Sequence, residues 1–318
     1  MIHPFRVGVV GAGRVGAVLA AALRTAGHEV VAVAGESDAS RGRAAALLAD
    51  VPVLRPSAVA RSCDVLLLTV PDDMLANVVR TLADAGALHE GQYVVHTSGR
   101  HGLAVLAPAT EVGAHPIALH PAMTFTGTAL DLPRLADVVF GLTATAPDRG
   151  FAEALVADLG GRPMWVPEEM RTLYHAGLAH GANHLVTLVT EAREILAAAG
   201  AIGDISPADI LRPLLTAALD NALTQGDAAL TGPIVRGDAG TVQAHLADLD
   251  ANAPQTLRSY VAMARATLTR AVADGRLVPL RAQKIARLLD RYDTPVTQAP
   301  DVPHRDTPIS RTERQVRR

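Results

Sequence analysis

Three glycines near the N-terminus have the spacing of a phosphate-binding turn. Gly11, Gly13 and Gly16 form a G-x-G-x-x-G motif between an apolar run that predicts a strand (5–10) and an alanine-rich run that predicts a helix (14–26). Such glycines permit a tight bend, close approach of a pyrophosphate and close packing of helix on strand, while the helix N-terminus supplies amides. We therefore expect a dinucleotide to bind here, with Arg14 and Val15 among its contacts.

The residues after the second predicted strand (29–34) bear on which dinucleotide binds. Glu36 lies where an acidic side chain would bind the ribose hydroxyls of NAD. The segment that follows it, from Ser37 to Arg43, offers hydroxyl and guanidinium groups where the 2'-phosphate of NADP would lie. These patterns conflict. We favour NADP, contacted by Ser37 and Arg41, because serine followed by clustered arginines is harder to explain without a phosphate, and NAD stays the alternative.

Two further segments follow predicted strands at their carboxyl ends. Pro71 comes directly after the apolar run 64–70, and Thr97 and Ser98 follow the run 92–96. Ligands of open parallel sheets bind beyond the carboxyl ends of the strands. We therefore expect Val70, Pro71 and Thr97 to contact the nicotinamide end of the cofactor, and we count Ser98 among the catalytic candidates.

Candidate substrate contacts come from two other places. The segment beginning at His120 follows a predicted strand (116–120), and we expect His120, Met123 and Phe125 to form a wall of the substrate pocket. Packing in the core is the alternative for Met123 and Phe125. Arg236 lies in a turn between helices, where its planar guanidinium would fit a substrate carboxylate. Pairing with Asp238, or a helix cap, is the alternative there.

The order of the elements predicts two domains. Short apolar runs alternate with helices up to residue 166, including a short predicted strand at 51–54 and later strands at 138–143 and 162–166. Long helices replace them at 168–199, 207–225, 239–249, 254–273 and 279–291. We predict an α/β chain: a Rossmann-type, mostly parallel sheet over 1–166, an all-helical substrate and dimerisation domain over 167–293, and a disordered tail over 294–318.

Composition narrows the range of partners. The 29 basic and 32 acidic residues nearly cancel, so we expect no nucleic acid partner. The single cysteine, Cys63, excludes an internal disulfide and a multi-cysteine metal site. No apolar run reaches the roughly 18 residues of a membrane span, and no leader precedes the glycine turn. These features predict a cytoplasmic protein without a membrane partner.

Four segments resemble a known group of enzymes: 96–99 (HTSG), 118–127 (ALHPAMTFTG), 174–185 (YHAGLAHGANHL) and 230–238 (LTGPIVRGD). The group is the superfamily of ketopantoate reductases, β-hydroxyacid dehydrogenases and pyrroline-carboxylate reductases. The closer resemblance is to oxidoreductases with a Rossmann domain and a helical C-terminal domain of unknown function. The resemblance implies a homodimer that places the substrate between the two domains. Some members of the group are linked to pantothenate biosynthesis.

One residue of this family pattern is missing. The dehydrogenases and ketopantoate reductases carry a lysine and then an asparagine on the first helix after the Rossmann domain, where this chain has His180 and Asn183. The resemblance therefore makes His180 the expected proton donor, with Asn183 and His184 on the same helix face orienting the substrate. His175 points elsewhere and is a weaker candidate. A zinc site at His180 and His184 is the alternative, and we expect no metal.

Together these features predict an NADPH-dependent oxidoreductase that reduces a small carbonyl acid. The resemblance points to a 2-oxo acid, and specifically to ketopantoate, which would make the enzyme similar to 2-dehydropantoate 2-reductase. An imine reductase similar to pyrroline-carboxylate reductases is the first alternative, because the missing lysine matters less when the product is a basic amine. A non-catalytic regulatory protein that senses NADPH is the second alternative.

Overall fold

The computed structural model describes residues 4–200 and 205–292 and divides the chain into two compact units, Met1–Leu185 and Val186–Arg318. Each unit is described separately below. The domain boundary predicted after residue 166 stays a prediction, and the predicted disordered tail (294–318) lies outside the described residues.

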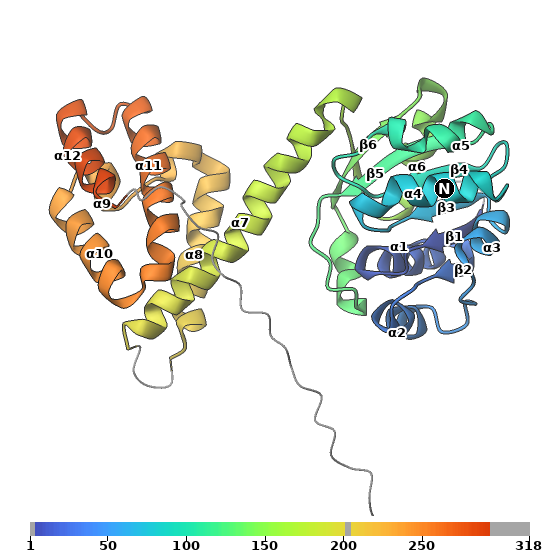
Figure 1. Ribbon diagram of the computed structural model, residues 1–318, viewed down its shortest axis with the longest axis horizontal. Coiled ribbons are helices and arrows are strands. Elements are labelled where there is room, and N and C mark those ends of the chain that lie inside the picture. Colours follow the sequence, from blue (N-terminus) through green and yellow to red (C-terminus); the bar gives the residue numbers. More distant parts are fainter. Residues whose placement is uncertain (1–3, 201–204, 293–318) are drawn as a thin grey trace, which may run out of the picture. The chain divides into compact units, whose positions relative to one another are not determined.

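The first unit contains the α/β sheet that the sequence predicts (Figure 1). Seven strands lie in the order β2-β1-β3-β4-β5-β6-β7. Neighbouring strands are parallel except β5 and β6, which pair in antiparallel register. The strands are β1 (Arg6–Val10), β2 (Glu29–Ala34), β3 (Val65–Leu68), β4 (Tyr93–His96), β5 (His115–Pro121), β6 (Val139–Ala144) and β7 (Arg162–Trp165).

Both faces of this sheet are buried, which explains why its central strands are apolar at nearly every position. Alternate side chains of a strand point to opposite faces. Val7 and Val9 of β1 accordingly join one core cluster, while Val10 joins the other. Helices α1 (Arg14–Thr25) and α6 (Arg149–Asp158) contribute to the first cluster, and α3 (Pro56–Arg61), α4 (Asp72–Asp84) and α5 (Ala107–Glu111) to the second. Helix α2 (Asp38–Leu47) packs beside α1.

The strand predicted at 51–54 is wrong. Only Val53 forms an isolated bridge, to Val33 of β2, and the segment forms no strand of its own. Pro52 has no amide hydrogen and cannot donate to a ladder, so the pairing stops after one bridge. The short helix α5 and the 3₁₀ turn Leu103–Leu106 before it were not predicted, because Pro108 interrupts the helical pattern of this stretch.

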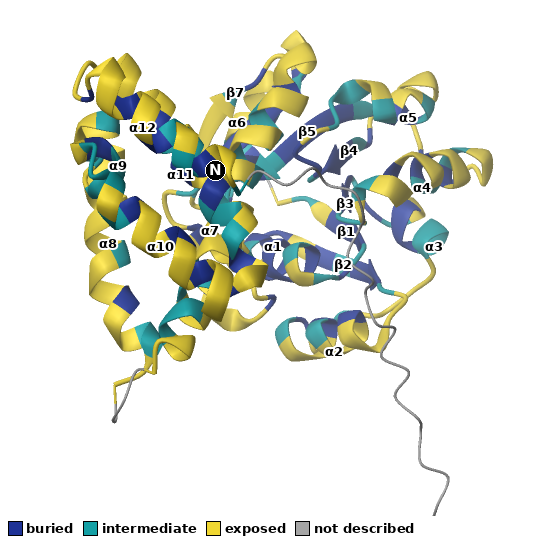
Figure 2. Ribbon diagram, turned by 60° about the vertical axis from the view of Figure 1, so that its left-hand side comes forward, coloured by how far each residue is buried: buried dark blue, intermediate teal, exposed yellow. Residues whose placement is uncertain are grey.

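The second unit is helical, as expected. It contains the end of α7 (Arg171–Ala198), then α8 (Pro207–Gln225), α9 (Pro233–Arg236), α10 (Ala239–Asn252), α11 (Leu257–Ala273) and α12 (Pro279–Asp290). Its core cluster comes from α9, α10, α11 and α12 and the segments that join them. Helix α8 is different, because Leu211 is its one buried residue and the rest of it is largely exposed (Figure 2). Within the described residues, no helix combines the length and apolarity that a membrane span requires.

We expect the core of the first unit to depend on Phe140, a fully buried side chain of β6. Phe140→Ala should lower the free energy of unfolding by about 3–5 kcal/mol, because it removes a packed ring and leaves a cavity. Urea unfolding followed by the fluorescence of Trp165, the only tryptophan of the chain, measures this in the same sheet. Leu130→Ala is the control, since Leu130 is 68% exposed and should change stability by less than about 0.5 kcal/mol. An equal loss of unfolding free energy in both variants would contradict the role of Phe140 in the core.

Candidate functional site

The glycine turn between β1 and α1 requires glycine at two of its positions. Gly11 has φ of +100°, and a Cβ there would lie 2.8 Å from the backbone of Thr69 and Val70. A Cβ on Gly16 would lie 2.4 Å from the carbonyl oxygen of Gly11 and closer still to the Thr69 hydroxyl. The same hydroxyl donates a 2.5 Å hydrogen bond to the Gly11 carbonyl. The end of β3 therefore fixes the shape of the turn.

Gly13 leaves space for a ligand at the start of α1. The nearest atom to a Cβ built on Gly13 is 3.8 Å away, so the backbone is open on this side. Gly13 is also the N-cap of α1, and no side chain of the described residues caps the helix. The amides of the first helical turn, which begins with Arg14 and Val15, have no carbonyl partner within the helix. They can therefore bind a phosphate group.

A cavity of about 610 Å³ lies beside this turn, which is within the usual range of small-molecule sites. It is bounded by the carboxyl ends of β1, β2 and β3, the strands on both sides of the point where the strand order reverses. Its lining includes five predicted cofactor contacts, namely Gly11, Gly13, Ser37, Val70 and Pro71. It also includes Glu36, Ser40 and Arg43 from the segment that bears on the choice of dinucleotide, and residues that the sequence did not predict as contacts: Leu54, Arg55, Thr69, Met74 and Val78.

The arginines after β2 take different positions. Arg41 donates hydrogen bonds to the Glu36 carbonyl oxygen and to the Asp38 carboxylate, at 2.6 Å each, on the exposed side of α2. Arg43 lines the cavity and is half-buried. Ser37 is the N-cap of α2, where its hydroxyl accepts a hydrogen bond from the Ser40 amide. Arg43 is thus the better-placed cation for a phosphate group in this cavity.

A loop after β5 holds Arg43 from the other side. A Cβ on Gly127, which has φ of +81°, would lie 2.8 Å from Nε of Arg43. The buried Asp131 carboxylate fixes this loop by accepting hydrogen bonds from the amides of Thr126 and Gly127, and these bonds lower the pKa of the carboxyl group against the opposing effect of burial. Met123 and Phe125 are half-buried and pack against the first core cluster.

The carboxyl end of β4 is built around His96. Its Nε2 donates to the Gly102 carbonyl oxygen at 2.9 Å, and its Nδ1 accepts from the Ser98 amide at 3.2 Å. Burial lowers the pKa of His96 to about 4, so this ring is uncharged at neutral pH. Ser98 is buried, and its hydroxyl accepts a hydrogen bond from the His101 amide. Ser98 thus helps to shape the loop, and the neighbouring Thr97 is half-buried.

A buried arginine joins this loop to the end of the sheet. Arg171, at the start of α7, is fully inaccessible to solvent. It donates to the Ser98 carbonyl oxygen at 2.8 Å and to the Thr143 hydroxyl of β6 at 3.0 Å. Its Nε lacks a hydrogen-bond partner among the described residues. Burial lowers the pKa of Arg171, and Tyr174 and Glu168 act in the opposite direction.

Three titratable side chains meet beside this loop. His120 of β5 lies 3.0 Å through Nδ1 from the Tyr174 hydroxyl, and the His120 and His175 rings meet edge to face with centroids 5.8 Å apart. Two glycines make room for them. A Cβ on Gly99 would lie 2.4 Å from the His175 ring, and one on Gly141 would lie 2.6 Å from the Tyr174 hydroxyl. His175, the weaker candidate of the sequence analysis, thus belongs to a polar cluster at this edge together with His120 and Tyr174.

The predicted catalytic residues of α7 lie further along the helix. His180 and His184 pair with each other through their Nδ1 atoms at 2.9 Å, and both are exposed, as is Asn183. His180 is five residues beyond His175, which corresponds to about 7.5 Å along the axis. Within the described residues, no three histidine, cysteine or acidic side chains are grouped to hold a metal ion, so the zinc alternative gains no support.

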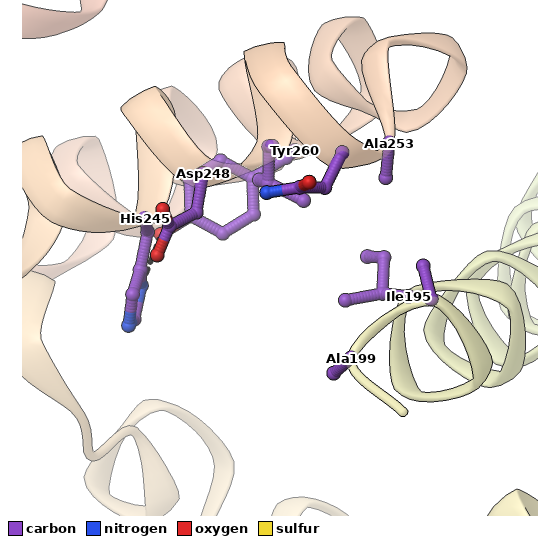
Figure 3. Close-up of a pocket in the computed structure, with 9 residues that line it drawn as sticks. Ile195, Ala199, His245, Asp248, Ala253 and Tyr260 are labelled. Carbon is purple, nitrogen blue, oxygen red and sulfur yellow. Dashed lines mark hydrogen bonds between the residues drawn. The ribbon is translucent and has the colours of Figure 1, made fainter. Parts of the chain in front are cut away.

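In the helical unit, Arg236 is exposed at the end of α9, and its carbonyl oxygen accepts a 3.4 Å hydrogen bond from Arg281. Asp238 caps α10 by accepting from the Thr241 amide and hydroxyl. A separate cavity of about 580 Å³ lies between the end of α7 and helices α10 and α11 (Figure 3). Its lining is Ile195, Ala198, Ala199, His245, Asp248, Leu249, Asn252, Ala253 and Tyr260.

Two domain families match the sequence. A Rossmann-like domain matches residues 2–121, and the domain of unknown function DUF2520 matches residues 138–267. Comparison with curated proteins gave no match.

Solved structures share the fold over most of the chain. A protein of Bacteroides fragilis described as an NADP oxidoreductase is 22% identical, with a TM-score of 0.71 over 83% of this chain and 98% of that one. An imine reductase from Pseudomonas sp. is 18% identical, with a TM-score of 0.62 over 89% of this chain and 99% of that one. Pyrroline carboxylate reductase of Plasmodium falciparum, with NADP bound, is 12% identical, with a TM-score of 0.54 over 91% of this chain and 99% of that one. At these identities the likeness concerns the fold. The chain therefore carries a Rossmann-like domain followed by the helical domain of unknown function DUF2520.

Proposed function

We propose that this protein is an NADPH-dependent reductase of a small carbonyl or imine compound. The observation that carries the proposal is the glycine turn at the end of β1. Gly11 and Gly16 are held against the Thr69–Val70 segment, Gly13 is open to a ligand, and the turn borders a cavity of about 610 Å³. This combination of open backbone and uncapped helix start fits a pyrophosphate. The solved structures with the same fold include NADP-bound reductases, which supports the proposal.

NADP is the proposed cofactor, with NAD as the alternative. Three groups favour a 2'-phosphate in the cavity: the guanidinium groups of Arg43 and Arg55 and the hydroxyl of Ser37. Glu36 lines the same cavity, and its carboxylate would suit the free ribose hydroxyls of NAD. Because two cationic side chains and one anionic side chain line this cavity, we favour the phosphorylated ribose of NADP over the free ribose of NAD. A bound nicotinamide cofactor supplies the hydride, so the chain has to provide binding, orientation and a proton.

Two substrate classes follow from the sequence and from the comparisons. The resemblance favours a 2-oxo acid, specifically ketopantoate, and hence a place in pantothenate biosynthesis. The solved structures with this fold include imine reductases and pyrroline carboxylate reductases, which favours an imine. The regulatory alternative predicts NADPH binding without turnover. A cytoplasmic location stays part of the proposal.

A homodimer is also proposed, and helix α8 supplies a specific reason. The large apolar residues of α8 cover about 220° of its circumference, yet only Leu211, near the middle of this arc, is buried. Ile210, Leu214, Leu219 and Leu223 on its flanks are 40–79% exposed. A helix with so broad an apolar face is normally covered by other elements. A second copy would offer the same face and form a two-fold interface.

The first test is turnover. We expect the purified protein to oxidise NADPH in the presence of at least one member of a panel containing ketopantoate, other small 2-oxo acids, pyrroline-carboxylate and simple cyclic imines. The decrease in NADPH absorbance measures the rate. Calorimetry with NADPH measures binding in the same preparation. Binding without turnover across the panel would favour the regulatory protein, and absence of binding would refute both functions.

The second test separates the two arginines after β2. Arg43→Ala should weaken NADPH binding about tenfold to a hundredfold, because a hydrogen bond to a charged phosphate contributes about 1.5–3 kcal/mol. NADH binding should change by less than about threefold, since NADH lacks the phosphate. Arg41→Ala removes the same charge from the exposed side of α2 and is the matched control. A larger effect of Arg41→Ala in calorimetric titration would reverse the assignment.

The third test concerns the dimer. The wild-type protein should have the mass of two chains in size-exclusion chromatography with light scattering. Leu214→Glu should shift it to the mass of one chain, because it would bury a carboxylate in an apolar interface. Thr224→Glu adds the same charge to the polar side of α8 and should leave the dimer intact. A monomeric wild-type protein at micromolar concentration would disprove the dimer.

A further inference from the structure

Tyr174 and His120 form a hydrogen-bonded pair at the edge of the sheet. His120 Nδ1 lies 3.0 Å from the Tyr174 hydroxyl, and the two rings meet edge to face with centroids 5.6 Å apart. His120 comes from the carboxyl end of β5 and Tyr174 from the first turn of α7. Both side chains are half-buried, so part of each remains open to solvent or to a ligand.

The pair lies on the same edge of the sheet as the glycine turn. Strands β1, β3, β4 and β5 are parallel neighbours, so their carboxyl ends share this edge. At about 4.8 Å per strand, the end of β5 is about 14 Å from the end of β1. A dinucleotide with its pyrophosphate at Gly13 and its nicotinamide directed along this edge spans that distance.

We propose that Tyr174 donates the proton that completes the reduction and that His120 is a positioning residue that holds its hydroxyl. The inference rests on the proposed reductase function. It assigns proton donation to the Tyr174 hydroxyl in a chain that lacks the lysine of the family pattern.

The proton transfer balances the hydride addition. A new C–H bond would form at the electrophilic carbon with the hydride of a bound reduced nicotinamide, whose own C–H bond would break, and the electron pair of the C=O or C=N bond moves to the oxygen or nitrogen. That atom binds hydrogen as the O–H bond of Tyr174 breaks, which leaves a phenolate. A proton from solvent restores the hydroxyl, and the oxidised nicotinamide cofactor accounts for the two electrons.

The charges around Tyr174 suit a phenol that stays protonated until it is needed. Burial raises the pKa of Tyr174, so the hydroxyl keeps its proton at neutral pH. Burial, together with unfavourable electrostatic interactions with His175 and Arg171, lowers the pKa of His120 to about 4. His120 is therefore uncharged above that pH and can hydrogen-bond the hydroxyl without competing as an acid.

The remaining charged neighbours come from α7 itself and from two other elements. Arg171 lies one helical turn before Tyr174, and its charge opposes the effect of burial on the pKa of Tyr174, which favours the phenolate once it forms. Asp72, at the start of α4, raises the pKa values of both His120 and Arg171, and Glu168 raises that of Arg171. Arg171 thus stays positively charged beneath the reacting hydroxyl.

Tyr174→Phe tests the inference in the active protein, because it removes only the hydroxyl. We expect kcat to fall about 10²–10⁴-fold, with KM and the NADPH dissociation constant changed by less than about threefold. Wild-type kcat should stay level from about pH 5 to 9 and fall as the phenol ionises above about pH 10, whereas an imidazolium donor would lose activity above about pH 6.5. Tyr260→Phe is the matched control, since Tyr260 also pairs with a histidine, His245, at 2.9 Å in the helical unit.

A second measurement needs neither cofactor nor substrate. In ¹⁵N-edited NMR spectra of the histidine rings, Tyr174→Phe should shift the His120 signals and leave those of His245 in place, and Tyr260→Phe should do the reverse. His120→Gln identifies the His120 signals. Unaltered His120 signals in Tyr174→Phe, or a kcat within about threefold of the wild-type value, would overturn the inference. A wild-type protein without any turnover would instead count against the proposed function, and the NMR result would still decide whether the pair exists.

Discussion

The buried guanidinium of Arg171 holds together the part of the Rossmann-like unit on which the candidate catalytic groups stand. It binds the Ser98 carbonyl oxygen after β4 and the Thr143 hydroxyl of β6, and Thr143 in turn donates to the Val166 carbonyl oxygen. A buried charge is costly unless polar groups surround it, and each buried partner left unsatisfied costs about 1–3 kcal/mol. The positions of these segments are therefore tied to one side chain at the start of α7.

This constraint also explains why α7 carries the polar cluster at its first turn. Once Arg171 is fixed, helix geometry sets the directions of the next residues. Tyr174 then lies above Gly141 of β6, and His175 lies against Gly99 in the loop after β4, where neither glycine has a side chain in the way. At the other end of this sheet edge, a polar side chain likewise fixes the glycine turn. The Thr69 hydroxyl binds the Gly11 carbonyl oxygen and leaves Gly13 open.

The sequence predicts what depends on local pattern. The strand Glu29–Ala34 and the helix Pro207–Gln225 match their predicted bounds, because apolar periodicity and turn residues define them. The prediction of a strand at 51–54 was wrong because it followed the valine-rich run and gave too little weight to Pro52, which cannot donate a hydrogen bond to a neighbouring strand. Arg41 and Arg43 are two residues apart and point in directions about 200° apart on a helix, so only the observed rotation of α2 separates them. The meeting of His120 with Tyr174 depends on how α7 packs on the sheet, which spacing along the chain does not reveal.

Gly127 has a consequence for coenzyme choice that follows from its lack of a side chain. Its backbone lies against Cδ and Nε of Arg43, and the hydrogen bond from its amide to Asp131 holds the loop in place. Any larger residue at that position would displace the arginine from the cavity, and with it the proposed contact to the 2'-phosphate. Under the proposed role of Arg43, preference for one coenzyme over the other would depend on a loop that belongs, by its place in the chain, to the opposite half of the Rossmann-like unit.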